Sequence, residues 1–170
     1  MQRIGTKALL WVLTLGMCAI IFVFSAQDGD ASMSTSGRFA MPIARLIASL
    51  QGGLSEKAFG ELLDNVQVVV RKTAHFTEYA ILGCLIFLLL TSYDIRRSLS
   101  LAEILTALYA AGDEIHQMLG GSRTGMWQDV VLDACGGLCG ILICRAVLRF
   151  REKRRISKTE SDKNAERQST

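Results

Sequence analysis

Residues 113–133 read DEIHQMLGGSRTGMWQDVVLD, and this stretch joins two apolar segments through a glycine-rich turn. The first segment ends in a polar group that includes Asp113 and His116. The second segment carries Asp129 and Asp133 within its first two turns. Ionisable side chains are costly inside a membrane and mark functional sites by default. The stretch therefore predicts two membrane helices that meet at one tight turn, with carboxylates gathered at that end.

The composition of the chain is that of a single membrane domain. It has 170 residues, of which 50% are hydrophobic, a net charge of +3 and a mean hydropathy of +0.30. The five cysteines lie in apolar stretches and lack the spacing of a metal knuckle or a disulfide framework. Fingerprints of dinucleotide sites, P-loops and nucleophile elbows are absent from the sequence. We expect no nucleic-acid partner, and membrane lipid as the surrounding partner.

Four apolar segments are long enough to cross a membrane, since about 20 residues span the hydrocarbon core. They cover residues 8–25, 73–93, 99–119 and 126–148. The first apolar run is longer than the core of a signal peptide, so we interpret it as a span. The sequence therefore predicts an all-α integral membrane protein, a bundle of four transmembrane helices.

The long connection between the first two spans, residues 28–71, opens with polar residues. From Arg38 onward apolar residues recur at helical spacing, and a second such run follows Gly52 and Gly53, with Ser55 as its predicted N-cap. Neither run is long or apolar enough to span. We predict one or two short amphipathic helices that lie at the interface or fold onto the bundle.

The last part of the chain differs in composition from the rest. Residues 1–150 form the predicted membrane domain, whereas residues 151–170 are first basic and then mixed and polar. Such a segment has too little apolar surface to pack. We predict that it is a disordered cytoplasmic tail.

The distribution of positive charge predicts the orientation, because cytoplasmic segments of membrane proteins carry an excess of Lys and Arg. With both termini inside, 13 basic residues are cytoplasmic and 6 are outside. We therefore predict an N-in/C-in topology in the cell membrane. In this orientation every unusual polar group lies at the extracytoplasmic ends of the spans.

The second span begins with polar residues on one helix face. Lys72, His75 and Tyr79 fall within about 60° of arc, and Glu78 lies beside His75. The fourth span carries a comparable stripe, in which Gly136 and Gly140 follow the two aspartates. Because these glycines share a face with ionisable residues, we expect them to serve close helix packing within the chain.

These positions define a candidate site at the outer ends of the spans. Its candidate general acids, bases or metal ligands are His75, Glu78, Asp113, His116 and Asp129. Its candidate substrate-binding residues are Ser25, Gln27, Lys72, Tyr79, Glu114, Gln117, Arg123 and Asp133. Arg123 is a candidate partner of Asp129 or Asp113. The spacing of these residues fixes neither a metal nor another cofactor.

Several of these stretches, in this order, resemble the VanZ-like family of bacterial membrane proteins. They are residues 24–27 (FSAQ), 72–79 (KTAHFTEY), 113–117 (DEIHQ), 123–125 (RTG), 129–130 (DV) and 133–136 (DACG). Residues 120–122 depart from the pattern, because the family often has a more apolar, proline-containing run there. The resemblance implies a role in the cell envelope, since the family takes its name from an accessory protein that raises resistance to teicoplanin, a lipidated glycopeptide.

Four functions remain open at this point. A binding protein would hold an amphiphile, a lipoglycopeptide or a cell-wall lipid through Lys72, Arg123 and the carboxylates. A membrane hydrolase or transferase would act on a lipid-linked or peptidoglycan-related substrate, with or without a metal. A proton-coupled carrier is disfavoured, because it needs polar groups across the whole membrane. In a purely structural role, the acid–base pairs would only tie the helices together.

Overall fold

The computed structural model describes residues 2–26, 29–119 and 127–168, and five helices account for nearly all of them. The helices are α1 (Gln2–Ser25), α2 (Gly29–Leu50), α3 (Glu56–Ser92), α4 (Ser98–Leu119) and α5 (Trp127–Gln168). The protein is therefore all-helical, as the sequence predicts.

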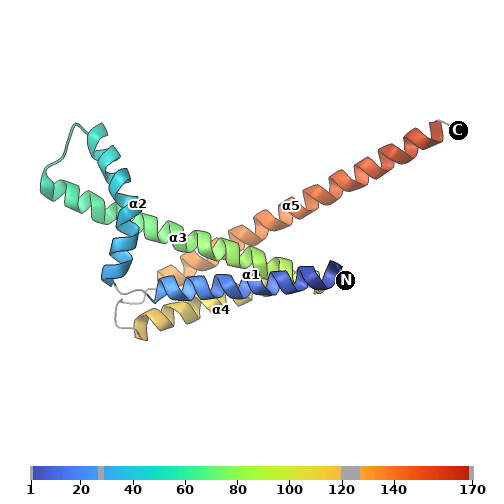
Figure 1. Ribbon diagram of the computed structural model, residues 1–170, viewed down its shortest axis with the longest axis horizontal. Helices are drawn as coiled ribbons and strands as arrows, with labels where there is room; N and C mark the ends of the chain where they lie inside the picture. The colour runs from blue at the N-terminus through green and yellow to red at the C-terminus, as the bar shows by residue number, and fades with distance from the viewer. Residues whose placement is uncertain (1, 27–28, 120–126, 169–170) are drawn as a thin grey trace.

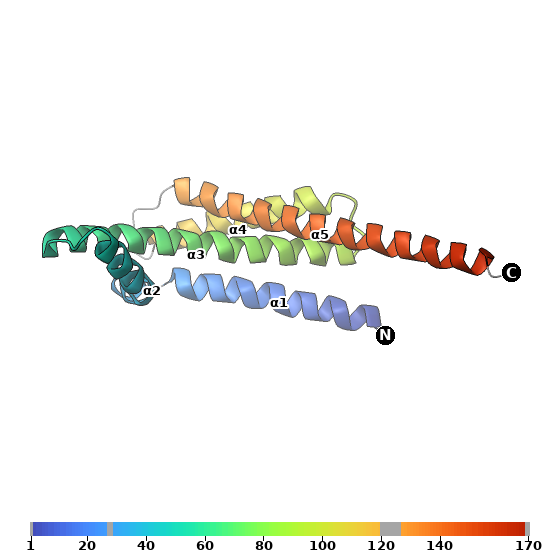
Figure 2. The same ribbon diagram turned by 90° about the horizontal axis from the view of Figure 1, so that it is seen from above.

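The long helix α3 organises the fold, because it contacts each of the other four helices. It lies between α1 on one side and the pair of α4 and α5 on the other (Figure 2). Helix α2 crosses the first part of α3 at a large angle to the remaining helices (Figure 1). α1 begins and α5 ends at the end of the molecule opposite to α2 (Figure 1).

Three helices are long and apolar enough to cross a membrane. The candidate spans are Ile4–Ser25, Glu56–Ser92 and Trp127–Glu160. Helix α4 has 22 residues, but its three carboxylates (Glu103, Asp113 and Glu114) make it more polar than these spans. The candidate spans indicate a multi-pass membrane protein.

The connection between the first two spans is more helical than the sequence predicts. α2 is a separate helix, but it begins within the stretch expected to be a polar loop. The second amphipathic run does not form a helix of its own, because it continues without a break into the span as the first turns of α3. α3 contains no proline, so its backbone hydrogen bonds continue through the point where the side chains change from amphipathic to mainly apolar.

The turn between α2 and α3 follows the local sequence. Gly52 and Gly53 have φ of 79° and 94°, a region that glycine enters without steric cost. The predicted N-cap is confirmed, since the Ser55 side chain accepts a hydrogen bond from the Ala58 amide at 3.4 Å.

Helices α3 and α5 pack closely because glycines leave room for the opposite backbone. A Cβ atom at Gly140 would overlap the carbonyl oxygen of Ala80, and one at Gly136 would overlap that of Phe76. The prediction that these glycines serve packing within the chain is confirmed. We call this contact the glycine seam.

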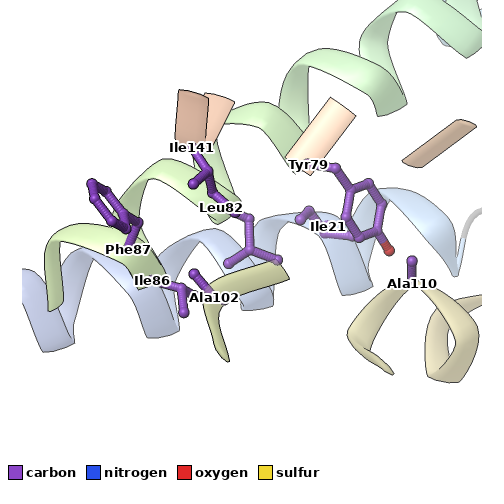
Figure 3. Packing of buried hydrophobic residues seen from close by; sticks show 8 residues of the cluster. All are labelled: Ile21, Tyr79, Leu82, Ile86, Phe87, Ala102, Ala110 and Ile141. Carbon is purple, nitrogen blue, oxygen red and sulfur yellow. The ribbon is translucent and has the colours of Figure 1, made fainter. Parts of the chain in front are cut away.

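The apolar core lies along the seam and draws on α1, α3, α4 and α5 (Figure 3). Its buried members are Ile21, Tyr79, Leu82, Ile86, Phe87, Ala102, Ala110 and Ile141. Tyr79 is fully buried and projects from α3 toward α4, beside Ala110 (Figure 3). One of the predicted substrate-binding residues is therefore part of the core.

Helix α5 also differs from the prediction, because it runs on to Gln168 where we expect a disordered tail. Residues 149–160 are exposed throughout, so no tertiary contact buries this part of the helix. Its support is local: Arg and Lys have high helix propensity, and the Arg154 guanidinium lies 4.4 Å from the ring centroid of Phe150, one turn away.

Candidate functional site

An ion pair joins the middle of α3 to the first turn of α5. The Nζ atom of Lys72 lies 2.7 Å from Oδ1 of Asp129. Asp129 is in the first turn of α5, where a carboxylate also interacts favourably with the helix dipole. Both side chains are partly exposed, at 43% and 30% of their surface, so water weakens the attraction. Asp129 thus has a partner from α3, and its predicted partner Arg123 lies outside the described residues.

A hydrogen-bonded chain joins the C-terminal ends of α1 and α4. The Gln117 amide donates to Oγ of Ser25 at 2.5 Å and to Oδ2 of Asp113 at 3.1 Å. All three side chains are buried. The sequence places these residues at one end of two different spans, and the structure brings them into direct contact. Gln117 therefore orients Asp113 and is one of the side chains that hold α4 against α1.

Asp133 is the centre of a group of carboxylates. It interacts electrostatically with Asp113, Asp129, Glu114 and Glu78, which come from three helices. Only 6% of its surface is exposed, and its Oδ1 atom has no hydrogen-bond partner within the described part of the chain. A buried carboxylate oxygen without a donor is destabilising. Its presence favours a functional role over a purely structural one.

A small polar cavity opens beside Asp133. We call it the polar cavity; it has a volume of about 20 Å³, room for about one water-sized group. Its lining residues are Arg71, Lys72, His75, Glu114, Gln117, Asp129, Leu132 and Asp133. Six of the predicted site residues therefore surround one space, to which α3, α4 and α5 all contribute.

A larger cavity lies on the other side of His75, between α1, α2 and α3. We call it the apolar cavity; its volume is about 250 Å³ and its surface is mostly apolar. Its lining residues are Phe24, Thr35, Ser36, Phe39, Val70, Arg71, Ala74, His75 and Glu78. The two cavities share Arg71 and His75, so they are neighbours across one turn of α3.

His75 and Glu78 form an acid–base pair between the cavities. Nδ1 of His75 lies 3.6 Å from Oε2 of Glu78, and both side chains are about one-fifth exposed. A histidine held next to a carboxylate can move a proton, provided that a substrate reaches it. The predicted proximity of these residues on α3 is present in the structure.

The structure separates His116 from the polar cavity. Its imidazole ring stacks on Phe22 of α1, with 4.5 Å between the ring centroids and an angle of 21° between the ring planes. Helical spacing groups His116 with Asp113 and Gln117, but the side chain turns toward α1. Its observed contact is thus one of packing.

The sequence analysis did not predict one of the cavity-lining residues or the apolar cavity. Arg71 lines both cavities, and its position next to Lys72 at the start of a polar helix face was an available signal. The apolar cavity had no such signal, because ordinary apolar residues from three helices form it. Gln27 and Arg123 lie outside the described residues.

The described residues do not form a ready metal site. Across residues 2–26, 29–119 and 127–168, no three His, Cys, Asp or Glu side chains are arranged to hold a metal ion. The chemistry that this part of the chain offers is hydrogen-bond acceptance by carboxylates and proton transfer through His75.

The VanZ/LLP1 family model matches residues 10–149 of this chain. No curated protein and no solved structure matches it. The matched region begins within α1, includes all of α2, α3 and α4, and ends within α5. It therefore contains all the site residues described above. Because this match covers most of the sequence, the chain belongs to the VanZ/LLP1 family.

Proposed function

We propose that the protein crosses the cell membrane four times, with both termini in the cytoplasm. α4 supports this count, since its 22 residues extend about 33 Å, enough to cross a hydrocarbon core of about 30 Å. The common end of α1 and α5 in Figure 1 fits an even number of spans. The excess of basic residues at that end favours its cytoplasmic location.

In this orientation α2 lies at the outer surface of the membrane. It runs across the direction of the other helices (Figure 1), as a helix in the membrane plane would. One of its faces packs on α3, whereas its large apolar side chains remain exposed. These exposed side chains are Phe39, Ile43, Leu46 and Leu50. Such a stripe is typical of a helix that lies in the interfacial layer of a lipid bilayer.

The function we propose is the binding of an amphiphile or a cell-wall lipid at the outer face, with a contribution to glycopeptide (teicoplanin) resistance. The observation that carries this proposal is Asp133: a buried carboxylate with an unpartnered oxygen, on a cavity at the outer ends of three helices. Ligand donors would satisfy this oxygen in charge-assisted hydrogen bonds. Membership of the VanZ/LLP1 family supports the link to the cell envelope.

A second candidate is a membrane enzyme, a hydrolase or transferase that acts on a lipid-linked or peptidoglycan-related substrate. The pair of His75 and Glu78 favours it, because both residues line the apolar cavity, His75 also lines the polar cavity, and the pair can serve as a general base. The two candidates differ in one measurable respect. A His75→Gln variant would keep ligand binding and lose turnover in the enzyme, whereas a pure binding protein has no turnover to lose.

The test of the proposed function is teicoplanin susceptibility in a sensitive Gram-positive host at matched membrane levels of each variant. We expect the wild-type protein to raise the minimum inhibitory concentration, and Asp113→Asn, Asp129→Asn and Asp133→Asn to reduce this protection. The matched control is Glu103→Gln, the same type of change at the opposite end of α4. It should protect like the wild type, whereas a proton-coupled carrier would need this carboxylate.

Two results would contradict the proposal. Absence of protection by the wild-type protein would remove the resistance role. Protection that survives all three aspartate changes would remove the outer carboxylates from the site. Retained membrane levels of each variant, measured by immunoblotting, are required for either conclusion.

A further inference from the structure

The polar cavity and the apolar cavity are neighbours with different surfaces. Arg71 and His75 belong to the walls of both. The polar cavity has a volume of about 20 Å³ and the apolar cavity about 250 Å³. A single ligand that fills both therefore needs a small polar head and a larger apolar part.

The polar cavity presents mainly hydrogen-bond acceptors. Lys72, a cation that would bind an anionic group, is already 2.7 Å from Asp129. Only 6% of the surface of Asp133 is exposed, and its Oδ1 atom lacks a hydrogen-bond donor within the described residues. Among the residues that the structure describes, five carboxyl groups, counting that of Asp133, stand against the two permanent cations Arg71 and Lys72. This balance favours a head group that donates hydrogen bonds and carries positive charge.

The apolar cavity has the composition of a site for one hydrocarbon chain. Phe24, Phe39, Val70 and Ala74 supply its apolar walls from α1, α2 and α3. Phe39 also belongs to the exposed stripe of α2. The cavity is therefore continuous with the helix face that we place in the outer lipid layer, so a chain can enter from that layer.

We propose that the site binds a single-chain amphiphile with a primary ammonium head group. The ammonium group lies in the polar cavity and donates to Asp133, and the alkyl chain lies in the apolar cavity beside Ala74. This inference rests on the proposed function and specifies the ligand class of the same site. It differs from the expectation for a phosphate-bearing lipid, whose head group would meet a surplus of carboxylates.

The experiment compares three probes with the same chain: decylammonium, decyl phosphate and decyl glucoside. Each is titrated into the full-length protein in phosphatidylcholine nanodiscs, with the heat measured for empty nanodiscs subtracted. We expect decylammonium to bind at least tenfold more tightly than decyl phosphate, with the uncharged glucoside between them. Because this comparison uses the wild-type protein, it does not depend on the folding of any variant.

Two variants test the two parts of the space separately. Asp133→Asn removes the buried charge and should weaken decylammonium binding about tenfold or more, with little effect on decyl glucoside. Ala74→Trp fills the apolar cavity and should weaken all three probes at least tenfold. Its control is Ile81→Trp, which introduces the same side chain two turns further along α3 at a residue that is 47% exposed. The control should bind decylammonium within about twofold of the wild type.

The outcomes separate this inference from the proposed function. If none of the probes binds above the empty-nanodisc value, the inference is overturned, whereas the proposed function is decided by the teicoplanin susceptibility of the same variants. If decyl phosphate binds as tightly as decylammonium, ligand binding stands but the ammonium head is wrong. If Ala74→Trp binds all probes like the wild type, the chain does not occupy the apolar cavity and the inference is overturned.

Discussion

The contact between α3 and α5 has two regions of opposite character. Along the glycine seam, backbone meets backbone and no side chain separates the helices at Gly136 and Gly140. Near the start of α5, the same helices meet through charged side chains and line the polar cavity together with α4. The seam has an evident reason in stability, since close packing increases dispersion contacts. The unpartnered carboxylate of Asp133 has no such reason, and this difference supports the binding role proposed for the polar cavity.

The largest expected effect comes from closing the seam. Gly140→Ala places a methyl group onto the carbonyl oxygen of Ala80, so the helices must separate. We expect the free energy of unfolding in mixed micelles to fall by about 3 kcal/mol or more. Gly16→Ala is the control, because no atom lies within 4 Å of the added methyl group. Equal stability of the two variants would mean that the seam is looser than described.

A smaller loss is expected from the hydrogen-bonded chain at the outer end. Gln117→Leu leaves Asp113 and Ser25 buried without their donor. The free energy of unfolding should fall by about 1–3 kcal/mol. A double-mutant cycle with Ser25→Ala should show coupling between the two changes. Additivity within about 0.3 kcal/mol would show that the hydrogen bond between Gln117 and Ser25 contributes nothing.

The role of His116 can be tested by a change of ring. His116→Phe keeps an aromatic surface against Phe22 and should change the free energy of unfolding by less than about 0.5 kcal/mol. His116→Ala removes the stacked ring and should cost about 1 kcal/mol. Thermal unfolding of the three proteins in one detergent gives this comparison. A large loss in both variants would point to a polar role for the imidazole.

The smallest expected effect belongs to the ion pair at the outer end. Lys72 and Asp129 are 43% and 30% exposed, so their coupling in a double-mutant cycle should be about 0.2–1 kcal/mol. The coupling should fall as salt concentration rises. A salt-independent coupling of several kcal/mol would mean that the pair is shielded from water. The ion pair would then stabilise the contact between α3 and α5, as the glycine seam does.

The comparison also explains which features could be predicted from the sequence. Apolar length and helical spacing were sufficient to predict an all-helical protein, and the grouping of polar residues at one end located the polar cavity. The glycine stripe predicted the seam because the spacing of four residues defines one helix face. In each case the signal lies within a single helix.

Features that depend on several helices were not predictable in this way. The orientation of His116 depends on the position of Phe22 in α1, and the apolar cavity depends on the angle at which α2 crosses α3. The merging of residues 56–72 with the second span depends on backbone continuity, which a change in side-chain polarity does not interrupt. The last part of α5 is helical because its residues have high helix propensity, although residues 149–160 are not packed against another helix. For such an unpacked segment we expected disorder.

The most direct test of the account measures stability and protection together in Asp133→Asn. Asparagine has nearly the same shape and removes the buried charge, so the free energy of unfolding should be unchanged or higher than in the wild type. Protection against teicoplanin should be lost at the same membrane level. A variant that is less stable yet still protects would contradict the account, because Asp133 would then serve the fold and not the site.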